Sequence, residues 1–197
     1  MTFVIEDGEG TRRKAGVNEF NQLKVYSESV PSEGIQAEVG NSFIIHAECH
    51  LAAASAGGLI SFTNNSDVYH LEVTRVYIDP HVLTPTDLII TQVFDATIAN
   101  GTDVTSTAIL NKNRGSANTF DLTVTASDAS SDMTYTGGVQ YHAFPATSMT
   151  STQRNMQNTN ILPRNTSITF GWKTVGGGNA TDGEIISMSI NVVRRQF

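Results

Sequence analysis

The stretch SFIIHAECHL, residues 42–51, alternates between apolar and mostly polar side chains. Successive side chains of a β-strand point to opposite faces of the sheet, so a period of two predicts a strand with one buried face. The side chains expected on the buried face are Phe43, Ile45, Ala47, Cys49 and Leu51. Those expected on the opposite face are Ile44, His46, Glu48 and His50.

Runs of the same kind recur along the chain, separated by clusters of Gly, Asn, Asp and Pro. They cover residues 59–63, 69–78, 88–94, 104–110, 120–126, 139–144, 167–175 and 184–193. Only Leu51 to Ala56 has a helix-forming composition. Strands without regularly intervening helices disfavour a doubly wound or TIM-type sheet. The pattern predicts an all-β fold, an antiparallel two-sheet sandwich that is jelly-roll-like.

The alternation also predicts which side chains fill the space between the two sheets. They are Phe43, Ile45, Cys49, Leu71, Val73, Phe120, Leu122, Val124, Ile168, Phe170, Ile186, Met188 and Ile190. Trp172 shares the face of Ile168 and Phe170, so we expect it in the core and not on a sugar-binding surface. Tyr77, Tyr135 and Tyr141 are the other aromatic residues that could support carbohydrate binding.

Two connections between the predicted strands are long and polar, namely Ser127 to Gly138 and Pro145 to Asn160. A structureless loop of this length in a compact domain is usually functional or disordered. Gly176-Gly177-Gly178 lacks the lysine and helix of a phosphate-binding loop, and it is predicted to form a hairpin tip.

The first 34 residues have a different character. A Gly-rich acidic turn separates a short apolar run from a basic one, which predicts a hairpin. So few apolar groups cannot bury a core of their own. We therefore expect residues 1–34 to form an extended arm ahead of a body at residues 35–197, and to be ordered only against that body or against a neighbouring subunit. The residues expected to make the contacts of this arm are Phe3, Val4, Ile5, Arg12, Arg13, Lys14, Leu23, Val25 and Tyr26.

The charge and composition exclude several function classes. Charged residues make up only 16% of the chain and its formal net charge is −7, which argues against a nucleic-acid-binding face. Basic residues gather near both ends, and Arg194-Arg195 either form a solvated terminus or dock onto an acidic neighbour. The apolar runs are too short to span a membrane, and no secretory leader opens the chain, so we expect synthesis in a cytoplasm and no membrane partner.

No residue pattern points to catalysis, a cofactor or a metal. His46, Glu48 and His50 share one strand face, but alternate positions on a strand are about 7 Å apart, which makes it difficult for one ion to contact all three. Cys49 is expected to be a small buried residue, and a single cysteine cannot form an internal disulfide. A nucleophile elbow motif is also absent from the sequence.

Three segments carry a resemblance to a known group of proteins. The opening pattern EDG-x-G, K-A-x-V-N and N-x-L-x-V-Y-S resembles the N-terminal arm of tailed-phage virion proteins. Residues 110–119, LNKNRGSANT, resemble their N-x-N-x-G-S-x-N-T segment, and residues 161–168, ILPRNTSI, resemble their approach to a late strand. Asn165 stands where that last segment often has Gly, and Asn tolerates the left-handed backbone that such a turn requires.

The resemblance implies a structural protein of a tailed bacteriophage, similar to head decoration (cement) proteins. Such a protein binds the major capsid protein on the capsid exterior, forms a dimer or trimer with itself, and is not an enzyme. A different class of function also fits the fold, namely a receptor- or glycan-binding module of a tail or head fibre.

Overall fold

The structure is a computed structural model that describes residues 36–84 and 87–196, together with four short strands between residues 4 and 24. The chain divides into two compact units, Met1–Pro31 and Ser32–Phe197. The sequence predicts the division a few residues later, after residue 34. The second unit holds the long strands and the core. Among the described residues, no helix has the length and apolar character needed to cross a membrane.

Eight long strands build the second unit. They are β5 (Ser42–His50), β6 (Ala56–Asn64), β7 (Tyr69–Pro80), β8 (Asp87–Phe94), β14 (Val139–Thr147), β15 (Thr152–Leu162), β16 (Ser167–Thr174) and β17 (Ile185–Gln196). An insertion between β8 and β14 contains short elements. These are β9 (Thr97–Ala99), β10 (Thr102–Asp103), α2 (Thr105–Ala108), β11 (Ile109–Asn111), β12 (Leu122–Ala126) and β13 (Thr134–Thr136).

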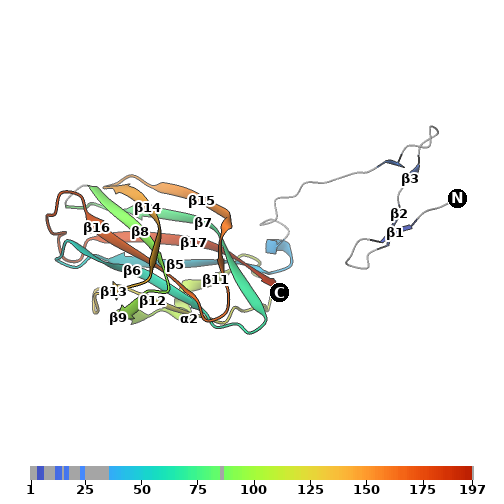
Figure 1. The fold of residues 1–197 in the computed structure, drawn as a ribbon, viewed down its shortest axis with the longest axis horizontal. Helices are drawn as coiled ribbons and strands as arrows, with labels where there is room; N and C mark the ends of the chain where they lie inside the picture. Colours follow the sequence, from blue (N-terminus) through green and yellow to red (C-terminus); the bar gives the residue numbers. More distant parts are fainter. Residues whose placement is uncertain are drawn as a thin grey trace. The chain divides into compact units, whose positions relative to one another are not determined.

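The strands form two antiparallel sheets with the orders β10-β12-β6-β16-β8-β14 and β11-β5-β17-β7-β15 (Figure 1). The first long strand pairs with the last, the second with the seventh, the third with the sixth and the fourth with the fifth. This nesting is that of one long antiparallel ribbon folded across two layers, which is the jelly roll. The predicted all-β, two-sheet sandwich is therefore confirmed.

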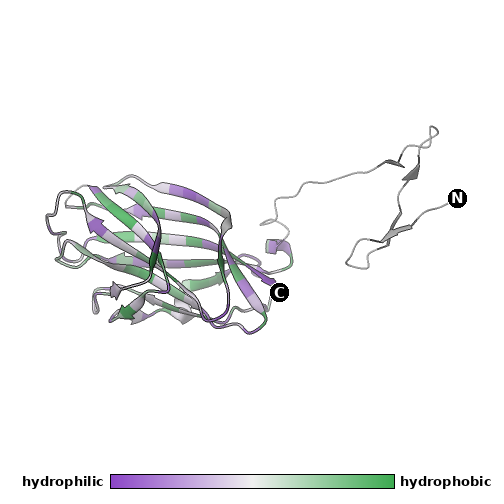
Figure 2. Ribbon diagram, in the orientation of Figure 1, coloured by the Kyte–Doolittle hydropathy of each residue, from purple (hydrophilic) through white to green (hydrophobic). Residues whose placement is uncertain are grey.

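The core lies between the two sheets and has the predicted composition. All thirteen side chains expected there are buried, from Phe43 on β5 to Ile190 on β17. Trp172 is also buried, as its position beside Phe170 predicts. Figure 2 shows apolar and polar residues alternating along the strands, as expected for strands that have one buried face.

The insertion covers part of the outer face of the six-stranded sheet. Tyr135 lies against the backbone of β16 at Gly171, where a Cβ would stand 2.2 Å from its ring. The Tyr135 hydroxyl shares a hydrogen bond of 3.0 Å with Thr91 on β8. Met133 packs in the same way against Gly58 on β6 and is buried. Glycine is therefore required at these two positions, because any side chain would displace the insertion.

The predicted loop from Pro145 to Asn160 is wrong. Strand β14 continues to Thr147, and residues 152–160 belong to β15, which pairs with β7. Strand β15 is the edge of its sheet, so it needs few apolar residues, and Met156 and Leu162 are buried. Its register on β7 shifts between Asn155 and Asn160, which marks an irregularity of the β-bulge type.

Three smaller expectations also differ from the structure. The strand predicted at residues 104–110 is the turn of helix α2 followed by the short strand β11. Residues 51–56 form no helix, and the polar connection at residues 127–138 contains strand β13. The predicted hairpin tip at Gly176 to Gly178 is wrong, because β16 and β17 belong to different sheets. These glycines lie in the connection between the sheets, where Gly176 and Gly177 have positive φ.

Phe170 provides a direct test of the core. It is fully buried on β16, between β6 and β8. Phe170→Ala should lower the free energy of unfolding by about 3–5 kcal/mol, because the cavity left in a packed sandwich collapses only partly. Val175→Ala, at a side chain that is 52% exposed, should change it by less than about 0.5 kcal/mol. Chemical denaturation measures both, and equal effects would contradict the assignment of the core.

Candidate functional site

The predicted contact residues of the N-terminal unit lie partly in short strands. Strand β1 (Val4–Glu6) pairs with β2 (Arg12–Lys14), which is the predicted hairpin, and β3 (Gly16–Val17) pairs with β4 (Leu23–Lys24). These strands contain Val4, Ile5, Arg12, Arg13, Lys14 and Leu23. Phe3, Val25 and Tyr26 lie outside the described residues. Isolated two-stranded hairpins are marginally stable, so a second surface would stabilise these strands.

Residues 36–41, which we call the arm root, connect the N-terminal residues to strand β5. Residues 36–38 form one helical turn, and Gly40 has a φ of 74°. A Cβ on Gly40 would stand 2.1 Å from the hydroxyl oxygen of Ser116. Only glycine therefore fits at this position of the root.

The segment at residues 110–119 holds the arm root through asparagine side chains. The Asn111 amide nitrogen donates to the Gly40 carbonyl at 3.0 Å. The Asn113 amide donates to the Glu38 carbonyl at 2.8 Å, and that of Asn118 donates to the Val39 carbonyl at 3.2 Å. Three consecutive carbonyls of the root are thus bound by one segment of the insertion.

The chemistry of this segment explains why asparagine recurs in it. The Oδ1 atom of Asn111 accepts from the backbone N–H of Asn113 at 2.8 Å, and that of Asn113 accepts from Gly115 at 3.0 Å. These local bonds shape the loop, while the amide nitrogens bind the root. An aspartate could supply only the acceptor, so the two roles require the amide side chain.

The C-terminal arginines contribute to the same region. Arg194 donates from Nε to Asn41 Oδ1 at 2.6 Å and from Nη1 to the Thr119 carbonyl at 2.9 Å. Its guanidinium also lies 4.7 Å from the centre of the Tyr69 ring. Arg195 forms an ion pair with the buried Glu72. Both side chains are engaged within their own unit, so the expected solvated terminus is wrong, and docking onto an acidic neighbour stays a prediction.

The role of the asparagines can be tested by removing one donor. Asn111→Asp keeps the acceptor but removes the amide donor to the carbonyls of Gly40 and Asn118, and it should lower the free energy of unfolding by about 1–3 kcal/mol. The Gly40 carbonyl then keeps only the longer bond of 3.4 Å from the Asn118 amide. The same change at Asn179, which is exposed in the β16–β17 loop, should have little effect. Urea unfolding measures both variants. Limited proteolysis should also cut Asn111→Asp faster near residues 36–41. An unaltered cleavage pattern would contradict the conclusion that these asparagine bonds hold the arm root in place.

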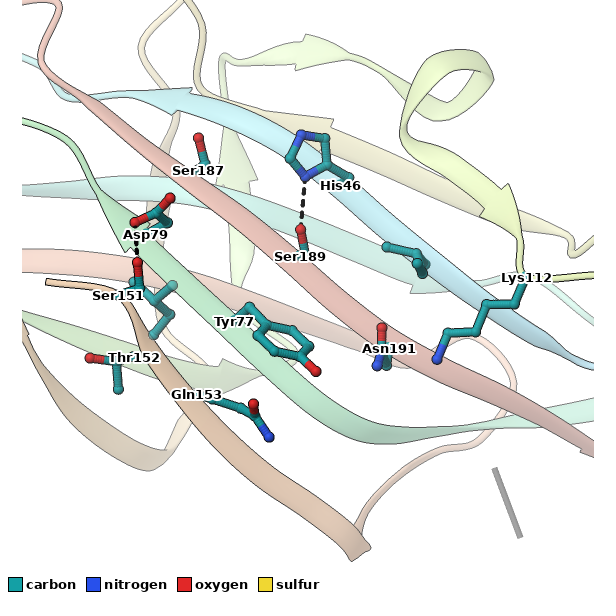
Figure 3. Close-up of a pocket in the computed structure, with 12 residues that line it drawn as sticks. His46, Tyr77, Asp79, Lys112, Ser151, Thr152, Gln153, Ser187, Ser189 and Asn191 are labelled. Carbon is teal, nitrogen blue, oxygen red and sulfur yellow. Dashed lines mark hydrogen bonds between the residues drawn. The ribbon is translucent and has the colours of Figure 1, made fainter. Parts of the chain in front are cut away.

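The outer face of the five-stranded sheet carries a hollow of about 800 Å³ (Figure 3). Its geometry follows from the pairing of the strands. On the central strand β17, Ser189 pairs with His46 of β5 on one side and with Tyr77 of β7 on the other. Tyr77 in turn pairs with Gln153 of β15. The small Ser189 therefore lies between the larger His46 and Tyr77, so the central strand β17 forms the floor of the hollow.

Hydrogen bonds orient several of the side chains that line this hollow (Figure 3). The Nδ1 atom of His46 lies 2.8 Å from the Ser189 hydroxyl, and the Ser151 hydroxyl donates to Asp79. Arg75 donates to the Tyr77 hydroxyl at 3.1 Å. A serine bonded to a histidine also occurs in hydrolases, where free backbone N–H groups or side-chain donors stabilise the oxyanion. Here β5 and β17 pair with each other at this very position, so their backbone groups are engaged in the sheet.

The strand β5 has the two faces that its sequence predicts. His46 and Glu48 are exposed and His50 is half-buried, whereas Cys49 is fully buried on the opposite face. Burial raises the pKa of the Cys49 thiol far above its usual range. Within the described part of the chain, no group of three His, Cys, Asp or Glu side chains is arranged to hold a metal ion.

A smaller hollow of about 300 Å³ lies beside the insertion, lined by His50, Asp128, Asp132 and Asp182 among others. Hydrogen bonds from the hydroxyls of Ser130 and Thr102 lower the pKa of Asp128 to about 2. The backbone N–H groups of Ser130 and Ser131 also donate to this carboxylate. The carboxylate thus stabilises its own turn.

Asp128 should therefore contribute to the acid stability of the fold. A pKa lowered by folding adds stability above the unfolded value, near 3.8, and that stability is lost as the pH falls towards 2. Asp128→Ala should lower the free energy of unfolding at pH 6 by roughly 0.5 kcal/mol, because water screens this exposed site. The difference from the unmodified protein should shrink between pH 4 and pH 2 in thermal unfolding. A stability difference between the two proteins that is independent of pH would contradict stabilisation of the turn by the charged Asp128 carboxylate.

Sequence reasoning missed the hollow although it identified the strands that form it. The signal was the polar outward positions of neighbouring strands, such as Ser187 and Ser189 on one and Tyr77 and Asp79 on another. Which of them lie side by side depends on the strand order, which alternation does not reveal. Tyr135 and Tyr141, named with Tyr77 as possible carbohydrate contacts, lie on the other sheet or its insertion and not in the hollow.

Comparisons with known proteins add little to this geometry. No protein family model and no curated protein sequence matches the chain. Among solved structures, it is similar to a chain of Desmodium yellow mottle tymovirus, with 10% sequence identity over 78% of this chain and 88% of that chain. The TM-score is 0.21, and a likeness at this level carries no argument about function.

Proposed function

We propose that the protein is a structural component of a tailed-phage virion, a head decoration (cement) protein that binds the major capsid protein on the capsid exterior. The observation that carries the proposal is where the three resembling segments lie. The first belongs to the separate N-terminal unit, the second binds the arm root, and the third forms the turn into β16. In that turn Asn165 has a φ of 57°, the left-handed conformation for which the related segments use Gly.

The division of the chain suits a protein that connects capsid subunits. A short strand-forming segment can add to the sheet edge of a neighbour through main-chain hydrogen bonds. The jelly roll supplies a rigid body, and the arm root gives the N-terminal segment a defined starting point. Weak contacts by arm and body then reinforce one another through effective concentration. The protein acts by binding and needs no catalytic group.

The long edge strands supply a surface for self-association. Strands β14 and β15 end their sheets on the same side of the sandwich, whereas the opposite edges are the short β10 and β11. Val139 and Tyr141 on β14 are 69% and 50% exposed, and Tyr141 packs against Phe94. Open edges with apolar side chains favour pairing with another chain. A closed symmetric dimer or trimer would cover them.

Binding to empty capsids tests the role of the arm. A variant lacking residues 1–31 should keep the melting temperature of the body, because the buried core lies within residues 32–197. It should bind capsids at least tenfold more weakly, because the contacts of the arm are lost. Sedimentation with purified empty capsids measures the affinity. Unchanged affinity of the truncated protein would refute the proposed role of the arm.

A charge variant makes the same test within the full chain. Replacing Arg12, Arg13 and Lys14 by Ser should weaken capsid binding if the basic strand β2 faces an acidic partner. Lys173→Ser, at an exposed position of the body, is the matched control and should bind normally. Equal binding by the unmodified protein, the triple variant and Lys173→Ser would contradict a contribution of the basic strand β2 to capsid binding.

The second candidate function, a receptor- or glycan-binding module of a fibre, is favoured by the hollow on the five-stranded sheet. Copy number in purified virions separates the two functions. A decoration protein is present in many copies distributed over the head, whereas a fibre tip has few. Cryo-electron microscopy of the particle would give both the copy number and the location.

A further inference from the structure

The hollow on the five-stranded sheet is a groove whose walls and floor come from the regular alternation of four strands. Three successive outward positions of β17, namely Ser187, Ser189 and Asn191, form its floor. The walls are β5 on one side and β7 with β15 on the other. Strands β5 and β7 are two strand spacings apart, about 10 Å, and the three floor positions span about 14 Å. These dimensions suit a short, narrow chain molecule lying along β17.

The lining combines apolar surface, to which the half-buried Ile44 contributes, with many hydrogen-bonding groups. Hydroxyls come from Ser187, Ser189, Ser151, Thr152 and Tyr77, and amides come from Gln153 and Asn191. Among the lining side chains, Asp79 and Lys112 carry opposite charges that cancel, and the guanidinium of Arg75 is engaged with the Tyr77 hydroxyl. The net charge of −7 on the whole chain further disfavours a polyanion.

The side chains are held in place before any ligand arrives. Tyr77 is half-buried and its hydroxyl accepts a hydrogen bond from Arg75, which limits rotation of the ring. His46 is bonded to Ser189, and Asp79 is bonded to Ser151 (Figure 3). A carboxylate accepts up to about four hydrogen bonds, so Asp79 keeps capacity for ligand hydroxyls. Groups held on strands lose little entropy on binding.

A peptide ligand fits this groove poorly. An extended peptide binds a sheet by pairing with an open edge, and the backbone of β17 is already paired on both sides. An amphipathic helix needs an apolar groove, and here the floor is formed by two serines and an asparagine. A ligand with many neutral hydroxyls and small apolar faces matches both the polar lining and the single aromatic ring of Tyr77.

We infer that this groove binds a neutral oligosaccharide, with Tyr77 against the face of one sugar ring and Ser189, Asp79 and Gln153 as hydrogen-bonding partners of its hydroxyls. All lining residues belong to the second unit, and sugar binding goes beyond the proposed attachment to the capsid. A protein can decorate the head without this activity, so each proposal can fail while the other stands.

The test measures binding of the full-length protein, without capsids, to an array of neutral oligosaccharides built from glucose, galactose, mannose and N-acetylhexosamines. Sulfated oligosaccharides serve as the anionic comparison. At least one neutral compound should bind, and isothermal titration should show at least tenfold weaker binding by Tyr77→Ala. Val175→Ala removes an exposed side chain outside the groove and is the control, with unchanged affinity expected.

A second variant keeps the test valid if Tyr77→Ala lowers stability. Ser189→Gln places a longer polar side chain on the floor of the groove, and it should block binding while the melting temperature stays close to that of the unmodified protein. The inference is overturned if no neutral oligosaccharide binds or if only sulfated compounds bind. It is also overturned if Ser189→Gln binds normally or if Val175→Ala loses as much affinity as Tyr77→Ala.

Discussion

The pairing of strand β17 with both β5 and β7 is the constraint on which the rest of the molecule depends. This last strand lies between the first and the third long strands of the body, so the five-stranded sheet cannot form without it. Its inward residues, Ile186, Met188 and Ile190, are fully buried in the core. Its outward residues form the floor of the groove, and Arg194 near its end binds the arm root. One strand therefore links stability, the groove and the root.

Buried and half-buried asparagines play a comparable part at the ends of the strands. Asn64 is fully buried, and its amide donates to the carbonyls of Tyr69 and Leu162, which joins the ends of β6, β7 and β15. Its own carbonyl accepts from the backbone N–H of Asn165 at 2.7 Å. Buried polar groups must be hydrogen-bonded, so these bonds specify how the strand ends meet. The asparagines at residues 111–118 do the same for the arm root.

The two outer faces of the sandwich differ because the insertion covers only one of them. Tyr135 and Met133 pack onto the six-stranded sheet, where Ser61 and Thr169 are buried and hydrogen-bonded to each other. The outer face of the five-stranded sheet keeps a groove with exposed polar side chains. A jelly roll by itself does not specify a function. What distinguishes this chain is an open groove, a held arm root and two long open edges.

The sequence by itself determined the fold class and the core, because a period of two in hydrophobicity marks which face of each strand is buried. It also predicted the N-terminal hairpin and the left-handed turn at Asn165, since both depend on local backbone preferences. Strand β15 was missed because an edge strand with one exposed face needs almost no apolar residues. The groove, the bonds of Asn111 and Asn113, and the internal contacts of Arg194 and Arg195 were decided by the tertiary structure alone. Each joins residues far apart in the chain, and their partners depend on strand order and register, which local periodicity does not encode.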